Sequence, residues 1–122
     1  MAGVDVAAAV ADQVAILTAG GVPATADARD LNPPGVLVLP PQVEWRIGKR
    51  SVAYLFTGLA VAPNVGSAGA LDALGVLLTA AQEALGGAIA NALPSDVPGI
   101  DGAAPGPGYR FTWHRIYRTD TP

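Results

Sequence analysis

The sequence VEWRIGKRSVAYLFTGLAV, residues 43–61, predicts a β-hairpin around which the rest of the chain is arranged. Its first arm, Val43–Ile47, alternates apolar and polar residues, which is the period of a strand with one buried face. Gly48-Lys49 predicts a tight turn, because glycine accepts a positive φ without steric cost.

The return arm of this hairpin is apolar on both faces. One face carries Val52, Tyr54 and Phe56, and the other carries Ala53, Leu55 and Leu59. A strand of this kind has to be covered on both faces, either by helices or by another subunit. The two tryptophans, Trp45 and Trp113, lie on the apolar faces of their strands and are predicted to belong to the core.

Two helices are predicted from apolar residues at helical spacing. The first spans Val4–Ala19, begins near Asp5 and ends at Gly20-Gly21. The second begins at Ser67, a candidate N-cap, and ends or breaks at Gly86-Gly87. The apolar stripes are Ala7, Val10, Val14 and Leu17 in the first helix, and Leu71, Leu74, Leu78, Ala81 and Leu85 in the second.

Two more strands complete the predicted order α-β-β-β-α-β. Gly35–Leu39 is a short interior strand bracketed by two Pro pairs, and Tyr109–Arg118 is the closing strand. The expected fold is therefore α+β: a single domain, residues 1–122, with a mixed or antiparallel four-stranded sheet and two helices packed on one face.

Three details of the C-terminal half are also expected. Arg115 interrupts the aromatic face of the closing strand, which predicts a bulge or an exit from the core. Ala88–Leu93 predicts one or two further helical turns, and Pro94–Pro107 predicts an irregular loop, because it is rich in Pro and Gly.

The composition indicates a protein of a reducing compartment that does not cross a membrane. There is no Cys, no signal peptide is recognised at the N-terminus, and the longest uncharged run is broken by Pro and Gly. The net charge of −3 argues against a nucleic-acid-binding protein. A soluble intracellular protein is therefore expected.

The charges are unevenly distributed along the chain. Six of the seven cations lie on or beside predicted strands, whereas most acids lie on predicted helices and loops. A basic zone centred on the sheet would suit an acidic partner or the acids of a neighbouring subunit. Solvated charge without a partner is the alternative interpretation. The six cations are Arg46, Lys49, Arg50, Arg110, Arg115 and Arg118.

Catalytic motifs are absent from the sequence. His114 is the single histidine, so a site with two His ligands cannot be built. Ser67 lacks the first Gly of a nucleophile elbow, and no phosphate-binding or dinucleotide fingerprint is present. Asp27 and Asp30 lie close together in a Pro-rich connector that gives them no defined shared site. We therefore expect no enzymatic activity, metal or cofactor.

The segment ATADARDLNPPGVLVLPP, residues 24–41, resembles the small tail-terminator, or tail-completion, proteins of long-tailed bacteriophages, particularly those of high-GC hosts. A hairpin, an Ala/Leu helix and the closing strand YRFTWHRI follow it in the same order as in that family. Gly35 departs from the pattern, because Cys or a similar small residue often stands there. The matching residues are Asp27, Arg29, Asn32, Pro33, Pro34, Val36–Val38, Pro40 and Pro41.

This resemblance implies a structural virion protein. It would assemble in the host cytoplasm as a hexameric ring at the head-proximal end of the tail tube, stop tube polymerisation and form the joint to the neck. Its partners would be copies of itself, the tail tube protein and a neck or head-completion protein. DNA would pass through the lumen without sequence-specific binding.

A ring requires head-to-tail interfaces that close. We expect Arg46, Arg110 and Arg118 to reach acids such as Asp27, Asp30 or Glu44 of a neighbour, and an alternative position for His114 is the lumen. The full set of candidate interface residues is Asp27, Arg29, Asp30, Glu44, Arg46, Lys49, Arg50, Arg110, His114 and Arg118.

Two other functions fit the same sequence. One is a head-tail connector, or head-completion protein, which would join the portal and would not bind tail tubes. The other is a small-molecule-binding α/β module, for which the aromatic face of the closing strand is the one indication.

Overall fold

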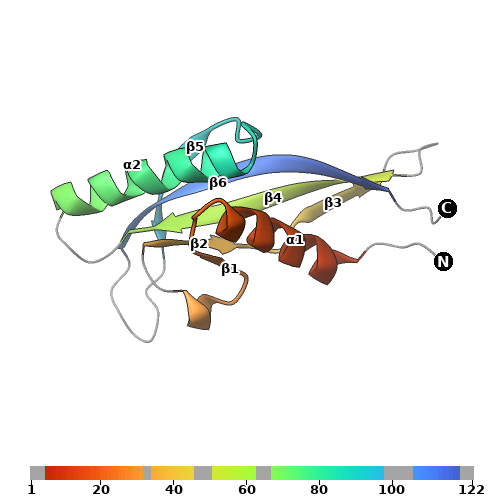
Figure 1. The fold of residues 1–122 in the computed structure, drawn as a ribbon, viewed down its shortest axis with the longest axis horizontal. Helices are drawn as coiled ribbons and strands as arrows, with labels where there is room; N and C mark the ends of the chain where they lie inside the picture. Colours follow the sequence, from red (N-terminus) through yellow and green to blue (C-terminus); the bar gives the residue numbers. More distant parts are fainter. Residues whose placement is uncertain (1–4, 32–33, 46–50, 63–66, 98–105, 119–122) are drawn as a thin grey trace.

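The structure is a computed structural model that describes residues 5–31, 34–45, 51–62, 67–97 and 106–118. In this part of the chain two helices pack against a six-stranded sheet (Figure 1). The elements in order are α1 (Val6–Ala19), β1 (Ala24–Thr25), the short 3₁₀ helix η1 (Ala28–Asp30), β2 (Gly35–Val38), β3 (Gln42–Trp45), β4 (Ser51–Val61), α2 (Ser67–Ala84), β5 (Ala92–Val97) and β6 (Gly106–Arg118).

The sheet is built on the long antiparallel pair of β4 and β6, which run side by side along the molecule (Figure 1). The strand order is β1-β2-β4-β6-β5, and β3 also pairs with β4. β1 and β2 are parallel and every other pair is antiparallel. The predicted α+β class and mixed sheet are confirmed, but the sheet has β1 and β5 in addition to the four predicted strands.

The predicted hairpin is present as β3 and β4. Trp45 pairs with Val52 and Gln42 with Leu55, in antiparallel register. The turn predicted at Gly48-Lys49 lies outside the described residues. β3 borders the first half of β4, and β2 borders the second half on the same side.

Pro40-Pro41 separates β2 from β3 and bends this edge of the sheet. Val38 pairs with Gly58 and Gln42 with Leu55, so residues 39–41 face only residues 56 and 57 of β4. One extra residue on one strand is a β-bulge, and Pro suits it because no ladder hydrogen bond is then required of its nitrogen. The amide of Leu39 still donates to the carbonyl of Thr57 at 2.9 Å.

The predictions for residues 88–107 are partly wrong, because Ala92–Val97 forms β5. This strand pairs with the first half of β6, and Pro94 lies opposite Tyr109. β5 is the edge strand, where half of the backbone amides point away from the neighbouring strand and Pro is tolerated. Pairing with the long strand β6 therefore outweighs the preference of the Pro and Gly residues for an irregular loop.

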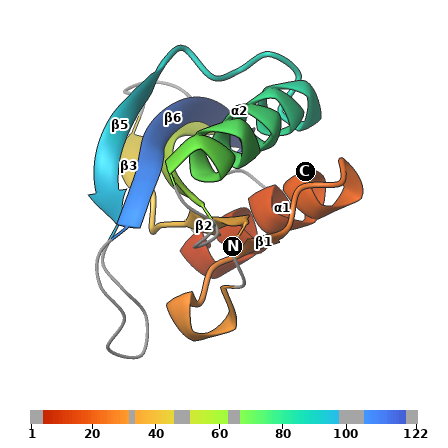
Figure 2. The ribbon, with the colours of Figure 1, turned by 90° about the vertical axis from the view of Figure 1, so that its left-hand side faces the viewer.

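Both helices lie on one face of the sheet, as predicted (Figure 2). Burial alternates along β4, and the side that faces the helices is closed: Phe56 is 0% exposed and Tyr54 is 2% exposed. Phe56 and Phe111 each stack on Trp113, with ring centroids 5.4 and 5.5 Å apart. This aromatic cluster is the centre of the core, and Trp113 is buried as predicted.

The helices differ from the prediction in which residues they bury. α1 begins at Val6, and the side chain of Asp5 caps it by accepting from the amide of Ala8 at 2.9 Å. Its fully buried residues are Ala9, Gln13 and Leu17. Of the predicted stripe, Leu17 is buried and Val10 and Val14 pack against the core, whereas Ala7 is exposed, so the stripe is wider than predicted and turned towards Ala9 and Gln13. Helical spacing fixed the period of this stripe, but Ala is too small and common here to fix its direction.

In α2 the prediction holds for most of the stripe. Leu74, Ala81 and Leu85 are buried, whereas Leu71 is 58% exposed. The helix ends at the predicted glycines, since Gly86 and Gly87 both have positive φ, a conformation that favours glycine.

Two predictions for the strands are wrong. β6 pairs with β4 in one unbroken register from Gly108 to Arg118, so Arg115 causes no bulge, although the face does leave the core here: Trp113 is buried, and Arg115 and Tyr117 are half-buried. Trp45 was expected in the core but is 70% exposed, because it pairs with Val52 near the beginning of β4, at the end of the sheet. The strand alternation placed Trp45 on the correct face but could not show where the helices end.

Candidate interaction surface

Neither α1 nor α2 covers the second face of the sheet, and we call this second face the open face (Figure 2). Its residues alternate along β4 and β6 with those of the core. They are half-buried or exposed, except for Val61, which Leu31 buries at the β2 end of the face. Its principal members are Glu44, Ala53, Leu55, Leu59, Leu93, Arg110, Thr112, His114 and Ile116.

Apolar side chains form most of this face. Leu59, Arg110 and Leu93 lie side by side across β4, β6 and β5, and Leu93 is 58% exposed. Ile116 is 61% exposed next to Ala53. Leu93 and Ile116 lie six positions apart along β6, and the half-buried Leu55 of β4 lies between them. Exposed apolar surface on a small protein marks interaction sites. The open face therefore has the composition of a surface that another molecule covers.

The open face also carries charge. Arg110 and His114 are both exposed and four residues apart on β6, so their backbones are separated by about 13 Å. Glu44 is exposed at the opposite edge, on β3. These three of the predicted interface residues share one face, and Arg110 is its central cation.

Four predicted cations are described in part or not at all. Arg46, Lys49 and Arg50 lie outside the described residues. The backbone of Arg118 pairs with that of Ser51 at the end of β6, but its side chain is outside the description. Their predicted contacts with a neighbour stay predictions.

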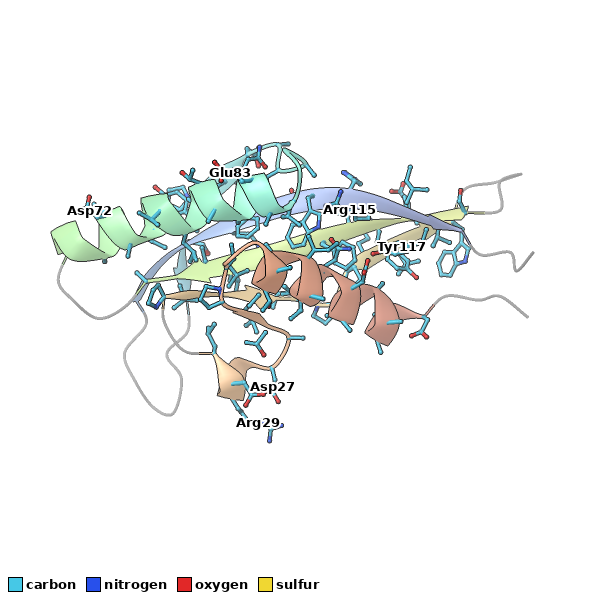
Figure 3. All side chains as sticks on the ribbon, viewed as in Figure 1. Asp27, Arg29, Asp72, Glu83, Arg115 and Tyr117 are labelled. Carbon is cyan, nitrogen blue, oxygen red and sulfur yellow. The ribbon has the colours of Figure 1, made fainter. Side chains whose placement is uncertain are left out.

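The remaining predicted residues, Asp27, Arg29 and Asp30, lie on or beside η1, and the residue that follows η1, Leu31, packs against Leu37 and Val61 at the β2 end of the open face. Arg29 forms a bidentate ion pair with Asp27. Arg29 Nη2 lies 2.9 Å from Asp27 Oδ2, and Arg29 Nε lies 3.2 Å from Asp27 Oδ1. The hydrogen bonds from Arg29 lower the pKa of the Asp27 carboxyl, and Asp27 in turn raises the pKa of Arg29. Figure 3 shows this pair far from Arg115 and Tyr117. The protomer itself thus neutralises Asp27.

A polar network under α1 was not predicted from the sequence. Its centre is Gln13, which is fully buried. The Gln13 Oε1 atom accepts from Trp113 Nε1 at 2.9 Å and from Arg115 Nε at 3.2 Å, and Gln13 Nε2 donates to the Tyr117 hydroxyl at 2.6 Å. These three partners, Trp113, Arg115 and Tyr117, occupy alternate positions of β6. The Gln13 side chain of α1 therefore hydrogen-bonds to three side chains on one face of the strand.

The network extends to Asp12 in the middle of α1 and to the C-terminal end of α2. The Tyr117 hydroxyl donates to Asp12 Oδ2 at 2.7 Å, and Arg115 Nη2 donates to the carbonyl of Leu85, just after α2, at 3.1 Å. A cation at a helix C-terminus is stabilised by the unpaired carbonyls. Figure 3 places Arg115 and Tyr117 along β6 beside the helices. Arg115 therefore holds α2 to the sheet, and this explains why a charged residue stays on the core face.

This network is suited to holding the fold together and not to proton transfer. Burial and the hydrogen bond to Asp12 raise the pKa of Tyr117 to about 12, far from the neutral value that a general acid or base needs. The signal in the sequence was the run of polar-tipped side chains on one face of β6, which require a partner when buried.

The outer side of α2 is a second exposed surface, and we call it the outer face of α2. Val76 is 72% exposed and Leu71 is 58% exposed. Asp72 and Glu83, both exposed, are eleven residues apart and lie about 16 Å from each other along the same side of the helix. Figure 3 shows both acids along the upper side of α2. A shallow groove of the same surface is lined by Gly75, Thr79 and Ala80.

The described residues offer no cluster for metal binding, since no three His, Asp or Glu side chains come together in them. None of the helices in the described ranges has the length and hydropathy needed to cross a membrane. Comparison of the chain with protein-family models, curated proteins and solved structures finds no match.

Proposed function

We propose that this protein is a structural assembly subunit that acts by joining copies of itself, in the manner of a phage tail terminator. The observation that carries the proposal is the open face. β4 is apolar on both sides, yet both helices lie on one of them (Figure 2). A lone protomer keeps Leu93 and Ile116 in water at 58% and 61% exposure, and a contact between subunits would bury them.

The more specific role rests on the resemblance of residues 24–41. Such a protein would form a ring at the head-proximal end of the tail tube, stop its growth and meet the neck. One feature of the fold supports this role. The sheet is tied to α1 and α2 by hydrogen bonds of Gln13 and Arg115, which fixes the relative positions of the surfaces that a closed ring would join.

Self-assembly is tested by measuring the mass of the purified protein. The protomer has a mass of 12.2 kDa, and we expect sedimentation and light scattering to give a defined multiple of it, alone or after addition of tail tubes. A strict monomer at all concentrations, with and without tubes, would contradict the proposal.

Termination is tested by electron microscopy of tails assembled with and without the protein. Tubes of uncontrolled length in its absence, and tubes of fixed length capped at one end in its presence, are the expected result. A protein that forms rings and binds portals but leaves tube length unchanged would instead be a head-tail connector.

A further inference from the structure

We infer that the open face of one copy docks on the outer face of α2 of the next copy. This inference rests on the proposed self-assembly and names the two surfaces that would perform it. The two surfaces lie on opposite sides of the protomer (Figure 2). The outer face of α2 points away from the sheet, and the open face is the side of the sheet that points away from α2. Each copy can therefore use both surfaces at once, which is the requirement of a head-to-tail assembly.

The apolar parts of the two surfaces match in kind. Leu93 and Ile116 stand out from the open face, and Leu71 and Val76 stand out from the outer face of α2. These four are among the most exposed large apolar side chains of the described residues. The groove on the outer face of α2 is lined by the small residues Gly75, Thr79 and Ala80. A neighbouring side chain can therefore approach the helix closely.

The charges are complementary. α1 and α2 contain no Lys or Arg, and the charged residues of the outer face of α2 are the acids Asp72 and Glu83. The open face presents Arg110 with His114, whose ring nitrogens add a hydrogen-bond donor. The spacing of about 13 Å along β6 is close to the spacing of about 16 Å along α2. Glu44 lies two strands away from β6, at the edge of the face.

Two other pairings are less favourable. Two open faces packed against each other would bring Arg110 of both copies to one interface, where like charges repel. The acids of η1 are a weaker partner for Arg110, because Asp27 is already bound by Arg29 at 2.9 Å. Among the described residues, no Lys or Arg forms an ion pair with the acids of the outer face of α2.

The test is a reciprocal charge reversal. One variant carries Asp72→Arg with Glu83→Arg, and the other carries Arg110→Glu with His114→Glu. All four side chains are exposed, so both variants should keep the wild-type circular dichroism spectrum. Asp30→Arg on η1, which is also exposed, is the position control.

Each reversed variant alone should sediment as a monomer, because every contact would then join like charges. An equimolar mixture should regain the wild-type mass, since copies of the two variants can alternate: each contact then joins opposite charges, whether both partners are native or both reversed. The Asp30→Arg control should assemble like the wild type. Recovery on mixing is expected only of a head-to-tail interface.

The inference is overturned if either reversed variant assembles like the wild type, if the mixture stays monomeric, or if Asp30→Arg alone dissociates the assembly. In these cases wild-type rings would still support the proposed function. A wild-type protein that never assembles would overturn both together.

Discussion

The two faces of β4 have nearly the same apolar composition but very different surroundings. Val52, Tyr54 and Phe56 are at most 2% exposed, whereas Leu55 and Leu59 on the other face are only half-buried. The neighbouring strand β6 explains the difference. It contributes Phe111 and Trp113 to the first face, and mainly Arg, Thr and His to the second. The hydrophobicity of one strand thus predicts that a face will be covered, and the adjacent strand decides whether the protomer covers it.

The polar groups of the two faces show the same contrast. On the core face, Trp113, Arg115 and Tyr117 bond to Gln13, and no buried side-chain nitrogen or oxygen of the described residues lacks a partner. On the open face, Arg110 and His114 are exposed. The polar groups of the core face thus find their hydrogen-bond partners within the chain, whereas the open face keeps exposed polar and apolar side chains that a partner molecule can contact.

The largest expected effect comes from a pair of substitutions at adjacent positions of β4. Phe56→Ala should lower the free energy of unfolding by about 3–5 kcal/mol, because it leaves a cavity beside Trp113. Leu55→Ala should cost about 1 kcal/mol or less in the protomer and should weaken assembly instead. Urea unfolding and sedimentation measure the two effects. Equal loss of stability at both positions would show that the open face is buried within the protomer.

A second pair tests the network at Gln13. Gln13→Leu should cost about 1–3 kcal/mol, because Trp113 Nε1 and Arg115 Nε lose their acceptor in the core. Gln42→Leu makes the same chemical change at an exposed position of β3 and should leave the free energy of unfolding nearly unchanged. A Gln13 variant as stable as the wild type would mean that the network does not hold α1 to β6.

Two glycines offer a comparison between the core and the outer face of α2. A Cβ at Gly58 would lie 2.6 Å from the Phe111 ring, so Gly58→Ala should cost about 1–3 kcal/mol. At Gly75 a Cβ meets no atom within 4 Å, and Gly75→Ala should raise the stability of α2 by about 1 kcal/mol. Thermal unfolding of both variants gives the sign of each change. A stabilising Gly58→Ala would mean that Phe111 does not rest on β4.

The smallest expected effect is a pH dependence at Tyr117. Its pKa is raised from 10.0 to about 12, so above pH 10 the unfolded chain loses this proton while the folded protein keeps it. The stabilisation is complete below pH 10 and is lost as the pH rises towards 12. Partial exposure of the side chain weakens the effect through solvent screening.

Tyr117→Phe should flatten this part of the pH profile. Urea unfolding of the wild type and the variant over pH from about 9 to about 12 measures the difference. A wild-type profile that runs parallel to that of the variant would show that Tyr117 ionises in the folded protein as freely as in the unfolded chain.

Local patterns predicted most of the elements. The hairpin arm β4, the strand β6, both helices and the glycine stop after α2 follow from period and capping signals that act within a few residues. β5 was missed because its stability comes from pairing with β6 and not from its own residues. The prediction for Trp45 was wrong because the sequence of a strand does not show how far the helices that cover the sheet extend.

For the candidate interface residues, too, the sequence predicted some features and only the structure showed others. The sequence indicated that cations gather on the sheet, and Arg110 and His114 do share its open face. It placed Arg115 on the aromatic face but could not show that Arg115 binds Gln13, or that Asp27 is bound by Arg29. Those partners are chosen by distances that exist only once α1, α2 and β6 are packed.

By itself, then, the sequence determined a strand with two apolar faces and the periodicities of the elements around it, because these depend on neighbours along the chain. Only the tertiary structure decided that both helices lie on one face and that Gln13 satisfies the polar groups beneath them. The physical reason is that burial and hydrogen bonding are settled between residues far apart in sequence, about a hundred positions in the case of Gln13 and Trp113.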